Sequence, residues 1–323
     1  MKAIKYSCYG APSVLKLEDS EKPQPKDNEV LVKIKAASVT RADTMMRQGS
    51  PYLGRLMLGL SRPKYSGMGT GFAGEIEAIG SGVTKFNVGD AVFGESIFGS
   101  GTNAEYVCVP ETGTLLKKPE SLSFEQACTL CDGPITSLNF LRDVGQLKAN
   151  QHVLIVGASG SLGTAAVQLA KQMGATVSAV CSTVNIELVK SLGADVVIDY
   201  SVENFSDNGE QYDLIFDTVG KHSFFSSKNS LKKNGVYLSP VFGVGHLLQM
   251  MMTTIIGNKK AKFSATGLRP AEEIQEMMAE LKNMFEAKKI QSVIDRCYPL
   301  AEAANAHAYI DKGHKKGNVV LVM

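Results

Sequence analysis

The feature that most constrains this chain is an apolar strand pattern that runs directly into three spaced glycines. The strand pattern His152-Val153-Leu154-Ile155-Val156 is followed by Gly157-Ala158-Ser159-Gly160-Ser161-Leu162-Gly163. Gly157 permits a tight turn, Gly160 lets a phosphate approach the backbone, and Gly163 allows close helix–strand packing. A helix that begins near Leu162 directs free N–H groups and a positive dipole end at an anion. The run therefore predicts a dinucleotide pyrophosphate site, to which we assign Gly157, Ser159, Gly160, Ser161, Leu162 and Gly163.

The same run has a competing interpretation. Gly157-Ala158-Ser159-Gly160 nearly matches the G-x-S-x-G turn that carries a nucleophilic serine in hydrolases. The fifth position is Ser161 rather than glycine, so Ser159 is better interpreted as a phosphate donor than as a nucleophile. A glycine turn that binds nothing is the other alternative.

Strand and helix patterns alternate from the glycine run onward. Strands are expected at His152–Val156, Thr176–Cys181, Val196–Asp199, Leu214–Asp217, Val236–Ser239 and Lys262–Thr266. Helices are expected at Leu162–Met173, Val184–Leu192, Phe224–Leu231, Pro270–Lys289 and Ala301–Ile310. Because strands joined through helices pair in parallel, the middle of the chain predicts an α/β class with a Rossmann-type, doubly wound parallel sheet.

The first ~120 residues have a different pattern, with short strand-like runs between glycines and prolines. Residues Glu29–Ala37 alternate like a half-buried strand, which favours a small β-rich barrel or sandwich. The pattern changes near Ser121, where Ser123 is expected to cap a helix with Gln126 three residues later. The terminal apolar strand Asn318–Val322 lies outside the six-strand series and is expected to return to the first domain.

Composition excludes several classes of protein. With 323 residues the chain is long enough for two domains, and a formal net charge of +2 without a basic stripe argues against nucleic-acid binding. The six cysteines are scattered, and the first residues carry no secretory signal, so a reduced cytoplasmic location is expected. The close pair Cys128 and Cys131 lies in a helical pattern without a second pair, and is interpreted as buried structural cysteines.

The most apolar segment is Val244–Gly257. It is shorter than the ~20 residues that span a bilayer and includes His246 and Gln249, so no membrane span is expected. We expect a helix packed in a core or at an interface. The alternative is a methionine-lined lid over an apolar substrate, with His246 as a pocket proton donor.

The loop after the second expected strand bears on cofactor choice. NAD binders usually place an acid there, about 20 residues after the glycine turn, whereas no acidic residue stands between Gly163 and Glu187. Ser182, Thr183 and Asn185 are therefore expected to donate hydrogen bonds to a 2′-phosphate, which favours NADP (NADPH). No Arg or Lys stands in this loop.

Several further motifs follow one another along nearly the whole chain. They are Ala37-Ser38-Val39-Thr40-Arg41-Ala42-Asp43, Arg47-Gln48-Gly49, Gly69-Thr70-Gly71-Phe72-Ala73-Gly74, Val88-Gly89-Asp90-Ala91-Val92-Phe93-Gly94, Ala104-Glu105-Tyr106-Val107, the glycine turn, Leu192-Gly193-Ala194-Asp195, Asp199-Tyr200 and Gly317-Asn318-Val319-Val320. In this order and spacing the chain resembles the medium-chain dehydrogenase/reductase superfamily, in its zinc-free quinone oxidoreductase (zeta-crystallin-like) branch.

The resemblance implies a discontinuous, GroES-like catalytic domain around an inserted cofactor domain. We expect the catalytic domain at 1–121 and 290–323, the Rossmann dinucleotide-binding domain at 122–289, and the active cleft between them. By motif, Ser182 and Tyr200 would lie near the adenosine phosphate and Thr136 near the nicotinamide ribose. Val219, Val241 and Phe242 would line the nicotinamide, while the tail around Lys315 and Asn318 would reach the cofactor from the other domain. Relatives are often dimers, so a homodimer is a possible assembly that no sequence feature fixes.

The chain departs from its relatives at a few positions. Many carry a basic residue at Val184 or Asn185, commonly Asp at Gly71 and Asn at Thr40. The zinc-bearing cousins place a Cys near Thr40 and Gly-His-Glu near Gly69, whereas this chain has neither, nor any H-E-x-x-H motif. No metal is therefore expected.

Chemistry without a metal suits acceptors that spread the developing charge. A quinone or an α,β-unsaturated carbonyl does so by conjugation, and hydrogen-bond donors then suffice. We expect hydride transfer from NADPH to a small apolar conjugated carbonyl substrate, with Thr40 and Tyr52 as candidate catalytic donors. The alternative for Thr40 is a strand-end cap, and the alternative for Tyr52 is a surface aromatic. Asp43 could support the pocket indirectly, but we expect it to form a helical ion pair with Arg47.

Two other functions remain open at this stage. One is a non-catalytic NADPH-binding or redox-sensing protein, and the other is an enoyl-thioester reductase. Turnover of an acceptor would separate the first from an enzyme, and a basic channel for a carrier phosphate would mark the second.

Overall fold

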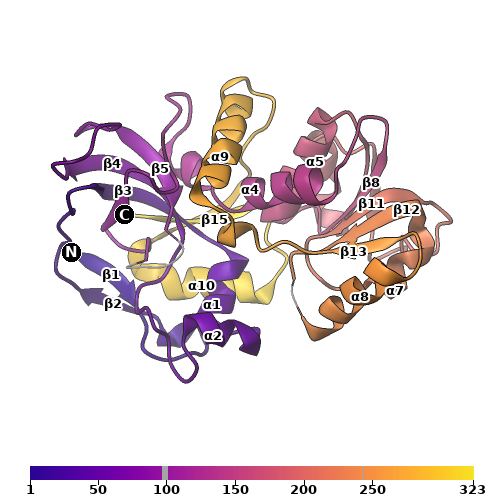
Figure 1. The fold of residues 1–323 in the computed structure, drawn as a ribbon, viewed down its shortest axis with the longest axis horizontal. Coiled ribbons are helices and arrows are strands. Elements are labelled where there is room, and N and C mark those ends of the chain that lie inside the picture. The colour runs from indigo at the N-terminus through magenta and orange to yellow at the C-terminus, as the bar shows by residue number, and fades with distance from the viewer. Residues whose placement is uncertain (97–100, 242) are drawn as a thin grey trace. The chain divides into compact units, whose positions relative to one another are not determined.

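The computed structural model describes residues 1–96, 101–241 and 243–323, apart from the side chains of Leu53 and Val244. The chain divides into two compact units (Figure 1). Unit 1 comprises Met1–Asp132, Arg269–Glu286 and Ile294–Met323, and unit 2 comprises Gly133–Leu268 and Ala287–Val293. Compared with the expected boundaries, the segment 122–132 and most of the helix after Pro270 group with unit 1.

Unit 2 contains a six-stranded, all-parallel sheet in the order β10-β9-β8-β11-β12-β13. Its strands are β8 (His152–Val156), β9 (Thr176–Cys181), β10 (Val196–Asp199), β11 (Tyr212–Asp217), β12 (Leu231–Leu238) and β13 (Lys260–Lys262). The central strands are almost wholly apolar and buried, as expected for a parallel sheet covered on both faces. The expected α/β class with a doubly wound parallel sheet is confirmed.

Helices connect these strands. They are α4 (Gly133–Leu138), α5 (Ser161–Gln172), α6 (Ile186–Ser191), α7 (Phe224–Ser227) and α8 (Val244–Ile255), with the π-helix η3 (Asn139–Val144) and the 3-10 helices η4 (Thr183–Asn185), η5 (Lys228–Ser230) and η6 (Thr266–Leu268). α5 packs on β8 and β9, and α4 packs on α5. The helix that follows the glycine turn is thereby fixed against the strand that precedes it.

Two expected element bounds in unit 2 differ from the structure. The last strand lies at Lys260–Lys262 rather than Lys262–Thr266, because Thr266 turns inward and its hydroxyl accepts a 2.8 Å hydrogen bond from Asn139. The expected helix Phe224–Leu231 ends early, since Leu231 already begins β12. The segment Val244–Gly257 forms helix α8, as expected. It is not buried in a core of this chain, because Ile255 is 83% exposed, and a place at an interface stays a prediction.

Unit 1 contains a seven-stranded sheet in the order β14-β15-β3-β4-β5-β7, with β6 also paired to β3, and a two-stranded sheet β1-β2. Its strands are β1 (Lys2–Lys5), β2 (Lys16–Asp19), β3 (Glu29–Val39), β4 (Gly71–Ile79), β5 (Ala91–Glu95), β6 (Tyr106–Pro110), β7 (Leu115–Lys117), β14 (Ile294–Pro299) and β15 (Asn318–Val322). β15 pairs antiparallel with β3, which confirms that the terminal strand returns to the first domain.

The helices of unit 1 come from both ends of the chain. They are η1 (Pro12–Val14), α1 (Arg41–Gln48), η2 (Tyr52–Gly54), α2 (Arg55–Leu58), α3 (Phe124–Cys128), α9 (Ala271–Glu286), η7 (Leu300–Glu302) and α10 (Ala303–Lys312). Ser123 caps α3 with Gln126 as expected, and Cys128 and Cys131 are buried free thiols. Among the described residues, no helix is both long and apolar enough to cross a membrane.

Candidate functional site

The glycine turn between β8 and α5 forms a cradle, which residues with side chains at the glycine positions would fill. Gly157 has φ 76°, a conformation that L side chains rarely adopt. A Cβ on Gly163 would lie 2.1 Å from the carbonyl oxygen of Gly157, so the helix can approach the strand only without one. Gly160 is the N-cap of α5 and supplies no side-chain cap. The first turn of α5 therefore presents its positive end to the cradle, and these residues fit a pyrophosphate.

Asn185 ties the next loop to this turn. Its amide Nδ2 donates to Ser159 Oγ and to Ser182 Oγ, both at 3.0 Å, and the side chain is 2% exposed. Both amide hydrogens are thus used inside the protein. Asn185 positions Ser159 and Ser182 rather than offering a donor to a phosphate.

An acid that the sequence analysis missed stands beside Thr183. The Thr183 hydroxyl donates to Asp199 Oδ2 at 2.5 Å, and Ser201 donates to Asp199 Oδ1 from its N–H and its hydroxyl. These hydrogen bonds lower the pKa of Asp199, which stays a carboxylate. A negative charge therefore stands beside Thr183, one of the residues expected to donate to a 2′-phosphate. The signal was available, because Asp199 pairs with Cys181 at the carboxyl ends of adjacent parallel strands.

Two of the expected nicotinamide residues pack against glycines: Val219 lies beside Gly157 of the glycine turn, and Val241 lies beside Gly220. A Cβ on Gly157 would lie 2.3 Å from Val219 Cγ2, and one on Gly220 would lie 2.6 Å from Val241 Cβ. Buried Asp217, which the sequence analysis also missed, holds this loop by accepting backbone hydrogen bonds from Val219, Gly220 and His222 at 2.8 to 3.1 Å. Phe242 lies outside the described residues.

Thr136 is carried by α4, which packs against the start of α5. Ser137 Oγ donates to the carbonyl of Leu162 at 2.8 Å. Gly133 approaches Ser161 so closely that a Cβ would lie 2.6 Å from Ser161 Oγ. The structure thus brings Ser161, Leu162 and Val219 to this turn, and Thr136 lies on the helix that packs against α5. Exposed Tyr200 follows β10, and its N–H donates to the carbonyl of Cys181 at the end of β9.

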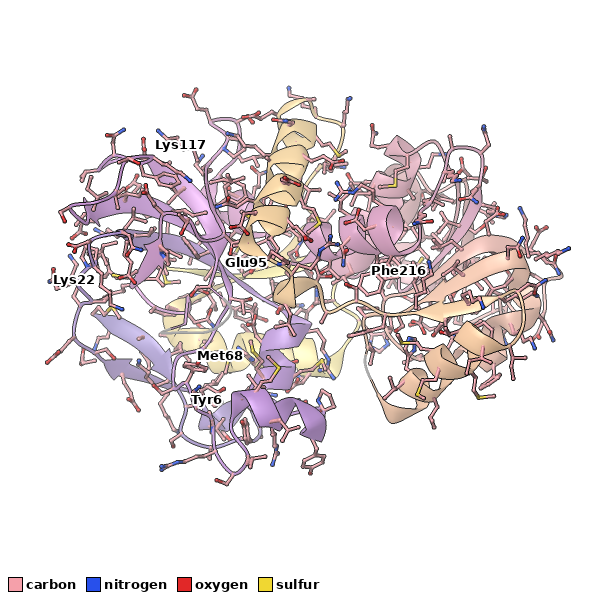
Figure 2. The ribbon with its side chains drawn as sticks, viewed as in Figure 1. Tyr6, Lys22, Met68, Glu95, Lys117 and Phe216 are labelled. Atoms are coloured by element: carbon pink, nitrogen blue, oxygen red, sulfur yellow. The ribbon has the colours of Figure 1, made fainter. Side chains whose placement is uncertain are left out.

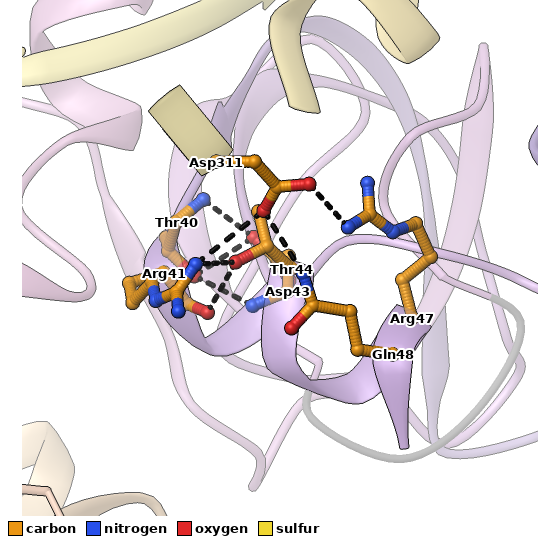
Figure 3. A network of polar contacts seen from close by, with 7 residues as sticks. All are labelled: Thr40, Arg41, Asp43, Thr44, Arg47, Gln48 and Asp311. Carbon is orange, nitrogen blue, oxygen red and sulfur yellow. Dashed lines mark hydrogen bonds and ion pairs between the residues drawn. The ribbon is translucent and has the colours of Figure 1, made fainter. Parts of the chain in front are cut away.

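In unit 1, α1 begins with a closed capping box. Thr40 accepts from the N–H of Asp43 at 3.1 Å, while Asp43 Oδ2 accepts from the N–H and the hydroxyl of Thr40 at 2.7 and 2.9 Å. The Thr40 hydroxyl proton is thereby directed at Asp43. The expected ion pair between Asp43 and Arg47 is wrong, because Arg47 bonds to Asp311 at 2.6 Å (Figure 3).

Unit 1 also contains four buried titratable groups, one of them in this helix start, and burial shifts the pKa of each. Desolvation raises the pKa of Asp43 to about 7, against the hydrogen bonds from Thr40, and the charge of Asp132 raises it further. Burial raises the pKa of Glu95 (Figure 2) well above its usual range and also raises that of Asp132. Burial lowers the pKa of Lys315 to about 8, against the charges of Asp132 and Asp295. Unit 1 therefore holds groups that exchange protons near neutral pH.

Comparison with known proteins covers the whole chain. Residues 26–120 match the alcohol dehydrogenase GroES-like domain, and residues 192–321 match a profile described as zinc-binding dehydrogenase. A chloroplast envelope quinone oxidoreductase homolog of Arabidopsis thaliana is 31% identical over 99% of this chain and 98% of its own length. A quinone oxidoreductase of Pseudomonas aeruginosa is 30% identical over 99% of both chains. The chain belongs to the zinc-free quinone oxidoreductase branch of the medium-chain dehydrogenase/reductase superfamily.

Solved structures agree with this membership. The quinone oxidoreductase from Coxiella burnetii matches with a TM-score of 0.88 and 32% identity over 100% of this chain and 99% of its own. The Escherichia coli quinone oxidoreductase complexed with NADPH matches with a TM-score of 0.87 and 25% identity over 100% of both chains. As a member of this family the chain is an oxidoreductase that uses a nicotinamide cofactor, and the GroES-like fold expected for its catalytic domain is confirmed.

The zinc-binding description of one profile has no counterpart among the described side chains of this family member. No group of three or more His, Cys, Asp or Glu side chains there is placed to hold a metal ion. Thr40 and Thr70 stand in the two motifs that bear Cys and His in zinc-bearing cousins. Threonine hydroxyls are poor zinc ligands beside thiolate and imidazole.

The other predicted residues lie in unit 1. Tyr52 is 80% exposed, with the Arg55 guanidinium over its ring at 4.6 Å. Lys315 Nζ donates to the carbonyl of Gly317 at 2.5 Å, and Asn318 is the buried first residue of β15. Gly71 opens β4 rather than a turn, and a Cβ there would meet Ser38 Oγ at 2.4 Å, so this strand accommodates no Asp without a shift.

Proposed function

We propose that this chain reduces quinones or α,β-unsaturated carbonyl compounds with NADPH. The observation that carries the proposal is an uncapped glycine turn of the right geometry in a chain whose relatives match it end to end. Two further relatives are a 2-methylene-furan-3-one reductase of Solanum lycopersicum, 31% identical, and an Arabidopsis thaliana NADPH-dependent alkenal/one oxidoreductase, 30% identical. Each aligns with 99% of this chain, which spans 79% of their length.

The residues around the turn have complementary tasks in cofactor binding. The N–H groups at the start of α5 and the Ser159 hydroxyl would bind the pyrophosphate, and Ser182, Thr183 and Tyr200 would lie along the adenosine end. Thr136 would contact the nicotinamide ribose, Val219, Val241 and Phe242 would line the ring, and Lys315 and Asn318 would reach it from the tail. When bound, the nicotinamide supplies a hydride from its C4.

The acceptor oxygen needs hydrogen-bond donors as negative charge develops on it. Thr40 and Tyr52 are the donors we propose. Because the Thr40 proton points at Asp43, Thr40 donates to an acceptor only when that bond is exchanged. Asp43, with a pKa of about 7, would be partly protonated at neutral pH. The protonated carboxyl would donate a hydrogen bond to the Thr40 oxygen, and the Thr40 hydroxyl could then turn its own proton toward the acceptor.

A panel of quinones and enones tests the reaction. NADPH oxidation followed by absorbance should show turnover with at least one conjugated acceptor and little with a simple alcohol or ketone. Tyr52→Phe should lower kcat, and Tyr65→Phe serves as a control tyrosine in the same segment. Tight NADPH binding without turnover of any acceptor would refute the enzymatic proposal and favour the non-catalytic alternative.

Calorimetry with NADPH and NADH tests the cofactor preference. We expect NADPH to bind more tightly, by a modest factor because Asp199 repels a 2′-phosphate. Asp199→Asn should strengthen NADPH binding several-fold and leave NADH binding nearly unchanged, since the charge acts only on the extra phosphate. Tighter binding of NADH to the native chain would contradict the proposal.

A further inference from the structure

Helix α8 turns its polar side chains toward the body of unit 2. Gln249 Oε1 accepts from the N–H of Phe224 at 2.9 Å, and buried Thr253 accepts from the N–H of Ala261 at 3.0 Å. His246 packs against the rings of Tyr237 and Phe263. These contacts, at positions 246, 249 and 253, fix the rotation of the helix about its axis.

The opposite side of α8 is apolar and faces solvent. Ile255 is 83% exposed and Ile256 70%. α7 lies beside α8 in Figure 1 and carries exposed Phe225. We call the exposed apolar residues of α8 and its C-cap the outer face of α8; it consists of Leu248, Met251, Met252, Ile255 and Ile256. An amphipathic helix of a water-soluble surface would have the reverse orientation, with apolar residues buried and polar residues outside.

The segment of sequence that carries this face has basic charges only. From Thr218 to Ala271 the sequence contains no Asp or Glu and eight Lys or Arg. Three of these lysines gather at the C-terminal end of α8. Lys259 Nζ donates to the carbonyl of Lys228 at 2.7 Å, and Lys260 Nζ donates to the carbonyls of Thr254 and Gly257.

We infer that the outer face of α8 docks on an anionic lipid bilayer. A helix with an apolar outer side and lysines at its rim lies in the interface of such a membrane, where apolar burial and charge attraction add. The 12 residues of α8 are too few to cross it. A second copy of the chain fits less well, because it would bring the same basic segment against this one without an acidic residue to pair with it.

Co-sedimentation with vesicles tests this inference with the full chain. Vesicles of phosphatidylcholine with about a quarter phosphatidylglycerol should bind the protein, and vesicles of phosphatidylcholine alone should bind it far more weakly. High salt should reduce binding to the anionic vesicles. Met251→Ser with Ile255→Ser should weaken partition roughly tenfold or more, because two apolar side chains leave the interface. Lys228→Glu should weaken binding to the anionic vesicles and leave binding to phosphatidylcholine vesicles unchanged.

Val88→Ser is the matched control, since it removes an exposed apolar side chain from a turn of unit 1. Equal binding of native chain and double variant, or no binding to anionic vesicles, would overturn the inference. A dimer that the double variant converts to monomer, without vesicle binding, would assign the face to a second copy and overturn it as well. Activity toward a water-soluble acceptor should be unchanged in all variants, so failure here is independent of the proposed function.

Discussion

Helices α1 and α5 begin in opposite ways. α1 starts at Thr40, whose side chain and that of Asp43 satisfy each other's backbone N–H groups. α5 starts at Gly160, which has no side chain to cap it. The first turn of any α-helix leaves N–H groups without an intrahelical acceptor. In α1 side chains supply the acceptors, whereas the N-cap residue of α5 supplies none, which fits the pyrophosphate site that we propose.

The difference shows how the two units divide their tasks. The capping box of α1 requires unit 1 to bury a carboxyl group, which is unfavourable, but it fixes the backbone between β3 and α1. The start of α5 has no side-chain cap, which leaves space and positive potential for a phosphate. The missing side-chain cap is thus typical of a helix start that binds an anion, whereas a complete capping box is typical of a structural helix start.

The largest expected effect comes from closing the cradle sterically. Gly163→Val should abolish cofactor binding, or weaken it by at least about 100-fold, because its Cβ collides with the carbonyl of Gly157. Calorimetry with NADPH measures the effect, and circular dichroism checks that the variant folds. Gly245→Val, a helical glycine with open space around it, is the control and should bind normally. Normal binding by Gly163→Val would break the assignment of this turn.

The next effect concerns the cost of the closed box in unit 1. The folded pKa of Asp43 is raised to about 7, so the folded state favours the protonated acid. That stabilisation is complete below pH ~4 and is lost as pH rises through 7, by about 4 kcal/mol at most. Asp43→Asn keeps an acceptor oxygen and should flatten the decline in unfolding free energy between these pH values. An unchanged slope in denaturant titrations would show that Asp43 is not the group responsible.

A smaller effect is expected when the N-cap position of α5 is given a capping side chain, as α1 has. Gly160→Asp is sterically allowed, since its φ is −78° and its Cβ would lie 3.5 Å from the nearest atom. We expect unit 2 to gain about 1 kcal/mol of stability and cofactor affinity to fall roughly tenfold, because the carboxylate occupies the N–H groups and repels the pyrophosphate. Gly160→Ala, without cap or charge, should change both much less. Gains in stability and affinity together would contradict the comparison.

The smallest effect comes from opening α1. Thr40→Ala should lower the unfolding free energy by about 1 kcal/mol. Ser123→Ala removes a cap of the same type whose hydrogen bonds are exposed, and it should cost less. If both substitutions cost the same in denaturant unfolding, burial adds nothing to the α1 box.

Much of unit 2 was predictable because its signals are local. Strands β8, β9 and β10 match the expected bounds residue for residue, since apolar runs between turn residues define them, and β15 in unit 1 does the same. The glycine turn was predictable for the same reason. β13 was misplaced because its short run, Lys260–Lys262, owes its pairing to Val236 and Tyr237 rather than to its own composition.

The polar side chains were harder to predict because distant segments bring them together. Asp199 meets Thr183 only once β10 pairs with β9, and Arg47 meets Asp311 across 264 positions of sequence. The expected pair of Asp43 with Arg47 was reasonable from helical spacing. It failed because the capping box and α10 offered each residue a better partner.

The pairing of β15 with β3 also sets an order of assembly during synthesis. Val319 lies opposite Val39, so the sheet of unit 1 remains incomplete until a segment 280 positions later leaves the ribosome. Unit 2 lies almost wholly between these two segments and has all of its strands by then. Domains generally fold as units during translation, and non-local pairings form late. The cofactor-binding half is therefore expected to mature first, while β3 waits with an unpaired edge that chaperones would need to shield.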